Sequence, residues 1–137
     1  MLSVAEKRQL VASRTDWWHA IDVGDGIVTP GSCGVSYQQL LWNHLQLPAD
    51  MKGLRVLDVG TYDGFFAFEC ERRGAEVVAV DMVPEDCRCF ALAKRLLGSQ
   101  VKYFQMSVYD LDETRLGGQF DLVLFLGVYY HLRHLFI

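Results

Sequence analysis

The sequence has no apolar run long enough to cross a membrane, which takes about eighteen consecutive residues. It also begins without the charged start, apolar stretch and small-residue cleavage site that are typical of a secretory leader. We therefore expect no membrane span and a cytoplasmic location.

Basic residues are also few. The chain of 137 residues has 13 Lys and Arg against 17 Asp and Glu, a formal net charge of −4 at pH 7. Binding along a nucleic-acid backbone needs a broad basic face, which this composition does not favour, although a local basic patch is compatible with it.

Cysteines are scattered, and the sequence has no C-x-x-C pair. Cys87 and Cys89 lie two residues apart on a predicted helix and would point in different directions, so a zinc site that combines them with His131 and His134 is not favoured. We expect no metal, and we expect reduced thiols at all four positions: Cys33, Cys70, Cys87 and Cys89.

From residue 52 onward, the chain alternates apolar runs with helix-like segments. Strands are predicted over 54–59, 75–81, 101–106 and 120–126, and helices over 63–73 and 85–97. Short links of this kind require parallel strands with right-handed crossovers. The pattern predicts an α/β fold, a Rossmann-like doubly wound parallel sheet.

Residues 1–51 follow a different pattern, with predicted helices over 2–14 and 36–46 and a turn-rich stretch between them that has a brief strand at 27–28. We therefore divide the chain into an N-terminal helical and loop extension (1–51) and a Rossmann-like domain (52–137). The sequence ends where a fourth helix should begin. We expect the domain to be incomplete at its C-terminus, or the exposed sheet edge to be covered by another copy in a homo-oligomer.

Two predicted strands end in carboxylates, Asp58 within VLDVGTYDG and Asp81 after EVVAV. A dinucleotide fingerprint needs G-x-G-x-x-G, but here Gly60 is followed by Tyr62 and Asp63. A pyrophosphate would meet an aromatic ring and a carboxylate where a helix N-terminus should receive it. NAD or FAD, and a nucleotide-dependent oxidoreductase, are therefore disfavoured.

S-adenosylmethionine carries no phosphate and has cationic groups that suit nearby acids. Asp58 is placed to meet its amino-acid portion, and Asp81 to accept hydrogen bonds from its ribose hydroxyls. The alternative is that both carboxylates only cap loops and helices.

VLDVGTYDG, the downstream VVAVD and the stretch FDLVLFLGVYYHL resemble motifs of class I S-adenosylmethionine-dependent methyltransferases. DVGTYDGFFAFE, GVYYHLRH and WHAIDVGDGIVTPG resemble, more specifically, the tRNA wobble-uridine (carboxy)methyltransferase-like group. The first resemblance covers residues 53–134. It implies the cofactor-binding positions Asp58, Gly60, Thr61, Tyr62, Gly64, Asp81, Met82, Asp110, Leu111, Gly127 and Val128.

The resemblance also implies a role for several of these positions. Asp58, Gly60 and Gly64 would frame the methionine end, while Gly127 and Val128 would border the methyl group. Asp81 would hold the ribose and Met82 would lie against the adenine. Asp110 would reach the adenine amino group or orient the loop that does. The sequence departs from the family pattern at Tyr62, where glycine is usual, and at its last three residues, 135–137.

His131 and Tyr130 are the predicted catalytic residues. Methyl transfer depends mainly on positioning and needs a base only if the acceptor atom bears a proton. The imidazole side chain titrates near neutral pH, which makes His131 the candidate base. The alternative for His131 is a structural hydrogen bond that caps a helix.

Aromatic residues gather in two further places. Trp17, Trp18 and His19 would form either a lid over the cofactor or a plug at the sheet edge. The phenylalanines of the helix over 63–73 are expected in the core: Phe65, Phe66 and Phe68.

The leading hypothesis is therefore a methyltransferase that uses S-adenosylmethionine to methylate a small-molecule or RNA acceptor. The alternative is a truncated, non-catalytic module that keeps the cofactor pocket and acts by association. The sequence identifies neither the acceptor nor whether the donor is plain or carboxylated.

Overall fold

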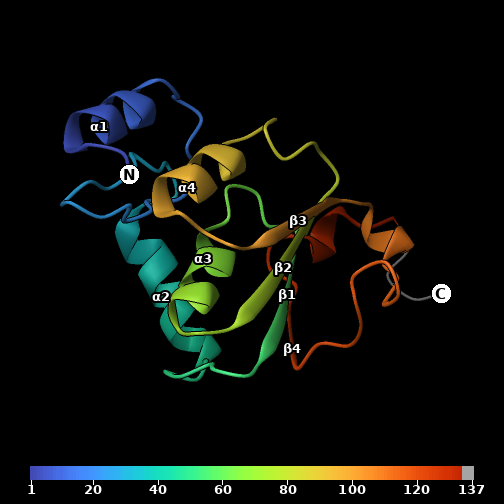
Figure 1. Ribbon diagram of the computed structural model, residues 1–137. Coiled ribbons are helices and arrows are strands. Elements are labelled where there is room, and N and C mark those ends of the chain that lie inside the picture. Colours follow the sequence, from blue (N-terminus) through green and yellow to red (C-terminus); the bar gives the residue numbers. More distant parts are fainter. Residues whose placement is uncertain (134–137) are drawn as a thin grey trace.

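A computed structural model describes residues 1–133, whose centre is a four-stranded parallel sheet (Figure 1). The strands lie in the order β3-β2-β1-β4. Asp58 of β1 is paired with Ala79 of β2 on one side and with Leu124 of β4 on the other. This confirms the predicted α/β parallel sheet, and its strands are β1 (Arg55–Val59), β2 (Glu76–Asp81), β3 (Lys102–Gln105) and β4 (Leu122–Leu124).

Four α-helices accompany the sheet in the described part of the chain: α1 (Val4–Ala12), α2 (Val35–Leu45), α3 (Phe65–Arg72) and α4 (Phe90–Leu97). Two single 3₁₀ turns follow β3 and β4: η1 (Val108–Asp110) and η2 (Tyr129–His131). None of the helices in residues 1–133 is long and apolar enough to cross a membrane.

The start of α4 corrects the sequence prediction. The sequence predicts this helix from residue 85, but it begins at Phe90. Residues 85–89 instead form turns, the first closed by the Cys87 N–H, which donates to the Pro84 carbonyl at 3.0 Å. Cys87 and Cys89 therefore do not lie within a helix as expected. All four cysteines are free thiols, and the predictions on His134 and on 135–137 fall outside the described residues.

One core cluster lies between the sheet and the helices. In Figure 1, α2, α3 and α4 lie on the same side of the sheet. Trp17 and Trp42 from the N-terminal segment belong to the same buried cluster as Phe68 of α3 and Leu96 of α4. The expected core positions of α3 are confirmed, since each is at most 8% exposed: Phe65, Phe66 and Phe68.

The opposite face of the sheet is covered by the irregular segment 106–121, drawn in orange in Figure 1. Strand side chains alternate between the two faces, so Val56 packs with the helices while Leu57 packs under this segment. The Arg55 guanidinium fixes the segment by donating to the carbonyls of Leu116 and Gln119, at 3.3 and 2.6 Å.

Candidate active site

Two neighbouring cavities open at the carboxyl ends of β1 and β2. Their volumes are about 470 Å³ and 450 Å³. In open α/β sheets, ligands bind beyond the carboxyl ends of strands where the strand order reverses, as it does here between β1 and β4. The cavities adjoin, because four residues line both: Gly60, Tyr62, Gly127 and His131.

The loop after β1 separates the two cavities. Gly60, Tyr62 and Gly64 all have positive φ values, of 75°, 57° and 91°. A Cβ atom at Gly60 would overlap Cγ2 of Val128 in the turn after β4. Tyr62 takes the left-handed conformation that a glycine would adopt without strain.

Asp81 lies at the second cavity and is 6% exposed. Its Oδ1 accepts the Met82 N–H at 2.8 Å and its Oδ2 accepts the Tyr62 N–H at 3.0 Å. Arg88 forms an ion pair with Oδ2 at 3.3 Å, and its guanidinium lies 4.0 Å from the centre of the Tyr62 ring. No local pattern marks Arg88 as a site residue, because the sequence places it inside a predicted helix.

Asp58 lies at the first cavity and is 3% exposed. Its Oδ2 and the Oγ1 of Thr61 are both buried and have no hydrogen-bond partner among residues 1–133. Burial raises the pKa of Asp58 to about 6. A ligand that brings hydrogen-bond donors or positive charge to this point would satisfy both oxygens.

Asp63 joins the loop to the N-terminal segment. It is fully buried, and its Oδ2 accepts the backbone N–H groups of Trp18 and His19 at 2.9 and 2.8 Å. Its Oδ1 lies 2.5 Å from Nδ1 of His19. This carboxylate therefore fixes residues 18 and 19 against the start of α3.

Trp17 and Trp18 are neighbours in the sequence but have different surroundings. Trp17 is 1% exposed in the core, and its indole N–H donates to the Val11 carbonyl. Trp18 is 46% exposed and lines the first cavity with His19. Trp17 thus packs in the core rather than over the cofactor, and a lid role for Trp18 and His19 stays a prediction.

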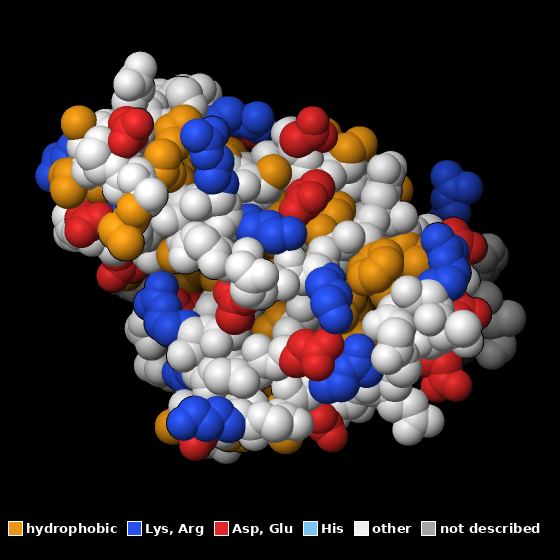
Figure 2. Space-filling model, in the orientation of Figure 1, with side chains coloured by type: hydrophobic (Ala, Val, Ile, Leu, Met, Phe, Trp, Pro, Cys, Tyr) orange, Lys and Arg blue, Asp and Glu red, His pale blue; other side chains and the backbone are white. Residues whose placement is uncertain are grey.

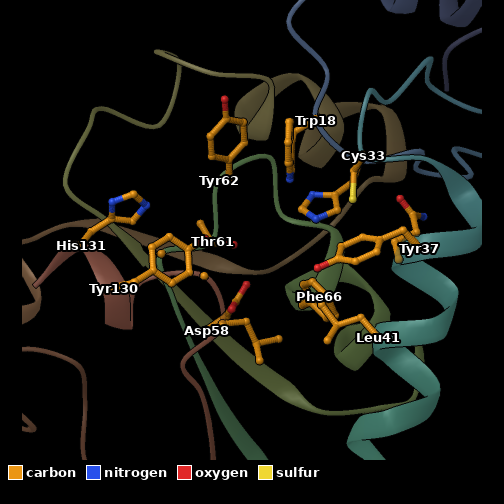
Figure 3. A pocket seen from close by; sticks show the side chains of 15 residues that line it. Trp18, Cys33, Tyr37, Leu41, Asp58, Thr61, Tyr62, Phe66, Tyr130 and His131 are labelled. Carbon is orange, nitrogen blue, oxygen red and sulfur yellow. The ribbon is translucent and has the colours of Figure 1, made fainter.

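The first cavity has two facing walls. Figure 3 shows Tyr37 and Leu41 projecting from α2 on one side, and Tyr130 and His131 on the other. Asp58 points upward into the space between them. The rings of Tyr130 and His131 lie 4.4 Å apart, and both residues are exposed.

Most of the predicted site residues lie together at these cavities. The first is lined by Asp58, Gly60, Thr61, Tyr62, Gly127, Tyr130 and His131. The second is lined by Gly60, Tyr62, Asp81, Met82, Gly127, Val128 and His131.

Gly64, Asp110 and Leu111 line neither cavity. Gly64 is packed so closely that a Cβ atom would overlap the Phe68 ring. Asp110 is exposed in η1, and Leu111 packs against the second core cluster. Residues just before them line the second cavity in their place: Ser107, Val108 and Tyr109.

The comparison with protein families matches residues 37–136 to a family described as a methyltransferase domain. A magnesium-protoporphyrin O-methyltransferase of Rhodobacter capsulatus is 39% identical over 80 residues, 58% of this chain and 34% of the relative. A ubiquinone biosynthesis O-methyltransferase of Xanthomonas euvesicatoria pv. vesicatoria is 30% identical over 128 residues, 93% of this chain and 50% of the relative. The chain thus spans half or less of these two relatives.

Among solved structures, the N-terminal domain of EvdMO1, crystallised in the presence of SAH and D-fucose, superposes with a TM-score of 0.71 at 23% identity. The match covers 97% of this chain and 57% of that one. The similarity establishes the fold.

Proposed function

This chain belongs to the methyltransferase domain family, and from that premise we propose that it binds S-adenosylmethionine and transfers the methyl group to an acceptor. One observation carries the proposal: two strand-end carboxylates lie in adjoining cavities, and one of them keeps a buried oxygen without a partner among the described residues. S-adenosylmethionine, when bound, supplies an electrophilic methyl carbon on a sulfonium.

The chemistry of the lining residues fits this cofactor. Asp58 and Thr61 offer unpaired oxygens to the ammonium group, and Asp81 offers carboxylate oxygens to the ribose hydroxyls. Met82, which is 72% exposed at the second cavity, provides an apolar surface for the adenine. The methyl group would lie where the cavities meet, bordered by Gly127, Val128 and the predicted catalytic residues Tyr130 and His131. Asp110 and Leu111 would not touch the cofactor and would affect its binding only by positioning the loop that lines the second cavity.

For the acceptor we propose a small molecule rather than RNA. The lining of the first cavity includes neither Lys nor Arg. On the face shown in Figure 2, basic and acidic side chains are intermixed, with no basic patch for a phosphate backbone. The finer resemblance to the tRNA wobble-uridine group supplies the competing RNA acceptor, and a tritiated-methyl assay with tRNA and a small-molecule panel separates the two.

The alternative that the sequence leaves open is a cofactor-binding module without turnover. Tight binding without label transfer would favour it.

We also propose self-association through the edge strand β4, where Val123 is 53% exposed. Size-exclusion chromatography that shows only a monomer would contradict that association. We keep the cytoplasm as the proposed location.

Calorimetry with S-adenosylmethionine and S-adenosylhomocysteine tests the assignment. Asp81→Ala should weaken both affinities roughly tenfold to a hundredfold, because hydrogen bonds to a charged group are lost. Asp86→Ala, an exposed substitution outside both cavities, is the matched control and should leave the affinities unchanged. A folded Asp81→Ala variant with wild-type affinity would remove the ribose assignment.

A further inference from the structure

His19 and Asp63 form a buried pair that the predicted catalytic residues do not include. The carboxylate has three contacts: the N–H groups of Trp18 and His19, and Nδ1 of the His19 ring. No Lys or Arg of residues 1–133 forms an ion pair with Asp63. A carboxylate that accepts the Nδ1 hydrogen fixes the tautomer of the imidazole and leaves Nε2 as the basic atom.

Packing also fixes the orientation of this ring. His19 stacks on Phe65, with ring centres 5.2 Å apart and planes inclined by 20°. It meets the edge of Phe66 at 5.7 Å. The residue is 8% exposed and lines the first cavity, and Nε2 has no hydrogen-bond partner in the described part of the chain. The pair therefore fixes the orientation of a ring that lines the cavity and leaves Nε2 as its basic atom.

His131 lacks such support. It is exposed on η2, and its ring contacts Tyr130 without a carboxylate partner among residues 1–133. A base must be held within hydrogen-bond reach of the proton that it removes, and an oriented histidine meets that need better than an exposed one. The geometry favours His19 over His131 as the base.

The other walls of the cavity indicate the kind of acceptor. Its charged lining residue is Asp58, which the proposed function assigns to the cofactor. Its remaining surface is rich in aromatic rings: Trp18, Tyr37, Phe66 and Tyr130. A volume of about 470 Å³ is in the range of small-molecule sites. An anionic acceptor would find no countercharge there, whereas a flat, neutral ring would find stacking surfaces.

We infer that His19, oriented by Asp63, is the catalytic base for O-methylation of a neutral aromatic alcohol bound in the first cavity. The inference rests on the proposed function. The acceptor hydroxyl gives its proton to Nε2 of His19 as its oxygen forms a bond to the methyl carbon. The carbon–sulfur bond breaks, its electron pair stays on sulfur as a thioether, and Asp63 stabilises the imidazolium.

4-Nitrophenol in the presence of S-adenosylhomocysteine tests this without turnover, because its phenolate absorbs visible light. At a pH where the free phenol is mostly protonated, the wild-type complex should show a phenolate band. His19→Gln should reduce that band at least tenfold without changing the affinity for S-adenosylhomocysteine. The exposed control His44→Gln should keep the band, and His131→Gln should reduce it less than His19→Gln does. Benzoate, which is flat but anionic, should not compete.

Nitrogen-15 NMR of the wild-type protein measures the protonation of the His19 ring directly. This second measurement does not depend on whether the variants fold. The His19 ring should carry its proton on Nδ1 in the S-adenosylhomocysteine complex and become doubly protonated when 4-nitrophenol binds. A loss of the band in His131→Gln as large as in His19→Gln, an unchanged His19 ring, displacement by benzoate, or failure of 4-nitrophenol to bind would each overturn the inference. Failure of S-adenosylhomocysteine itself to bind would instead overturn the proposed function.

Discussion

At the scale of single residues, burial of Asp58 without a ligand makes the charged form of its carboxyl group energetically unfavourable. Its pKa of about 6 lies well above the ordinary carboxyl value of about 4, a difference that corresponds to about 3 kcal/mol against the charged form. Because the folded state holds this proton more tightly than the unfolded state, the group's contribution to stability falls as the pH rises from about 4 to about 6. Because the Asp58 carboxyl is buried and one of its oxygens has no partner among the described residues, a ligand that brings positive charge to it is favoured.

S-adenosylmethionine binding should consequently release a proton near pH 6. The ligand's ammonium group favours the carboxylate and lowers the pKa of Asp58. Calorimetry at pH 6 in two buffers of different ionisation enthalpy should show release of about half a proton, and affinity should rise between pH 5 and 7. Asp58→Asn should abolish the release, whereas the exposed Asp86→Asn should preserve it. Equal release from Asp58→Asn would assign the proton to another group.

At the scale of elements, the loop after β1 and the turn after β4 pack closely because Gly60 has no side chain. Gly60 is required both by its φ of 75° and by the methyl group of Val128 that occupies the place of its Cβ. This close packing brings the two strand ends together at the junction of the cavities.

Gly60→Ala should lower the free energy of unfolding by about 2–4 kcal/mol, the sum of backbone strain and overpacking. Val128→Ala in the same chain should recover the overpacking part. Gly26→Ala is the matched control, because Gly26 has a φ of 70° and an added Cβ would meet no atom within 4 Å, so it should cost only about 1 kcal/mol. Urea denaturation measures all three. Equal losses from Gly60→Ala and Gly26→Ala would show that the contact with Val128 is unimportant.

The sequence predicted the elements better than their contacts. Buried strands appear as apolar runs, so all four were located to within two residues. The start of α4 was missed because a turn closed on Pro84 uses residues that also suit a helix. The pair of His19 and Asp63 joins positions 44 residues apart, and no local pattern encodes such a contact. The sequence marked His19 through the W-x-H part of the resembling segment and as part of a lid or plug, but not as a partner of Asp63.

At the scale of the whole molecule, the N-terminal segment and the sheet share one core. Trp17, Trp42 and Met51 belong to the same buried cluster as Val56 and Phe90. The proposed boundary between residues 51 and 52 therefore separates two sequence patterns that are packed together, and we expect them to unfold together.

Fluorescence offers a direct test, because all three tryptophans, Trp17, Trp18 and Trp42, lie before residue 52, whereas all four strands lie after it. Urea transitions followed by tryptophan emission and by far-ultraviolet circular dichroism should coincide. Trp42→Phe should shift both midpoints by the same amount. A tryptophan transition at lower urea would show that residues 1–51 form a separate folding unit.

The two cavities share four lining residues, Gly60, Tyr62, Gly127 and His131. The proposed cofactor extends over both cavities and the proposed acceptor lies in the first, so each ligand restricts side chains that the other would also have to order. Thermodynamic reciprocity then requires that each occupant change the dissociation constant of the other by the same factor. The common wall makes donor and acceptor a coupled pair of ligands, so that the presence of one changes how tightly the other is bound.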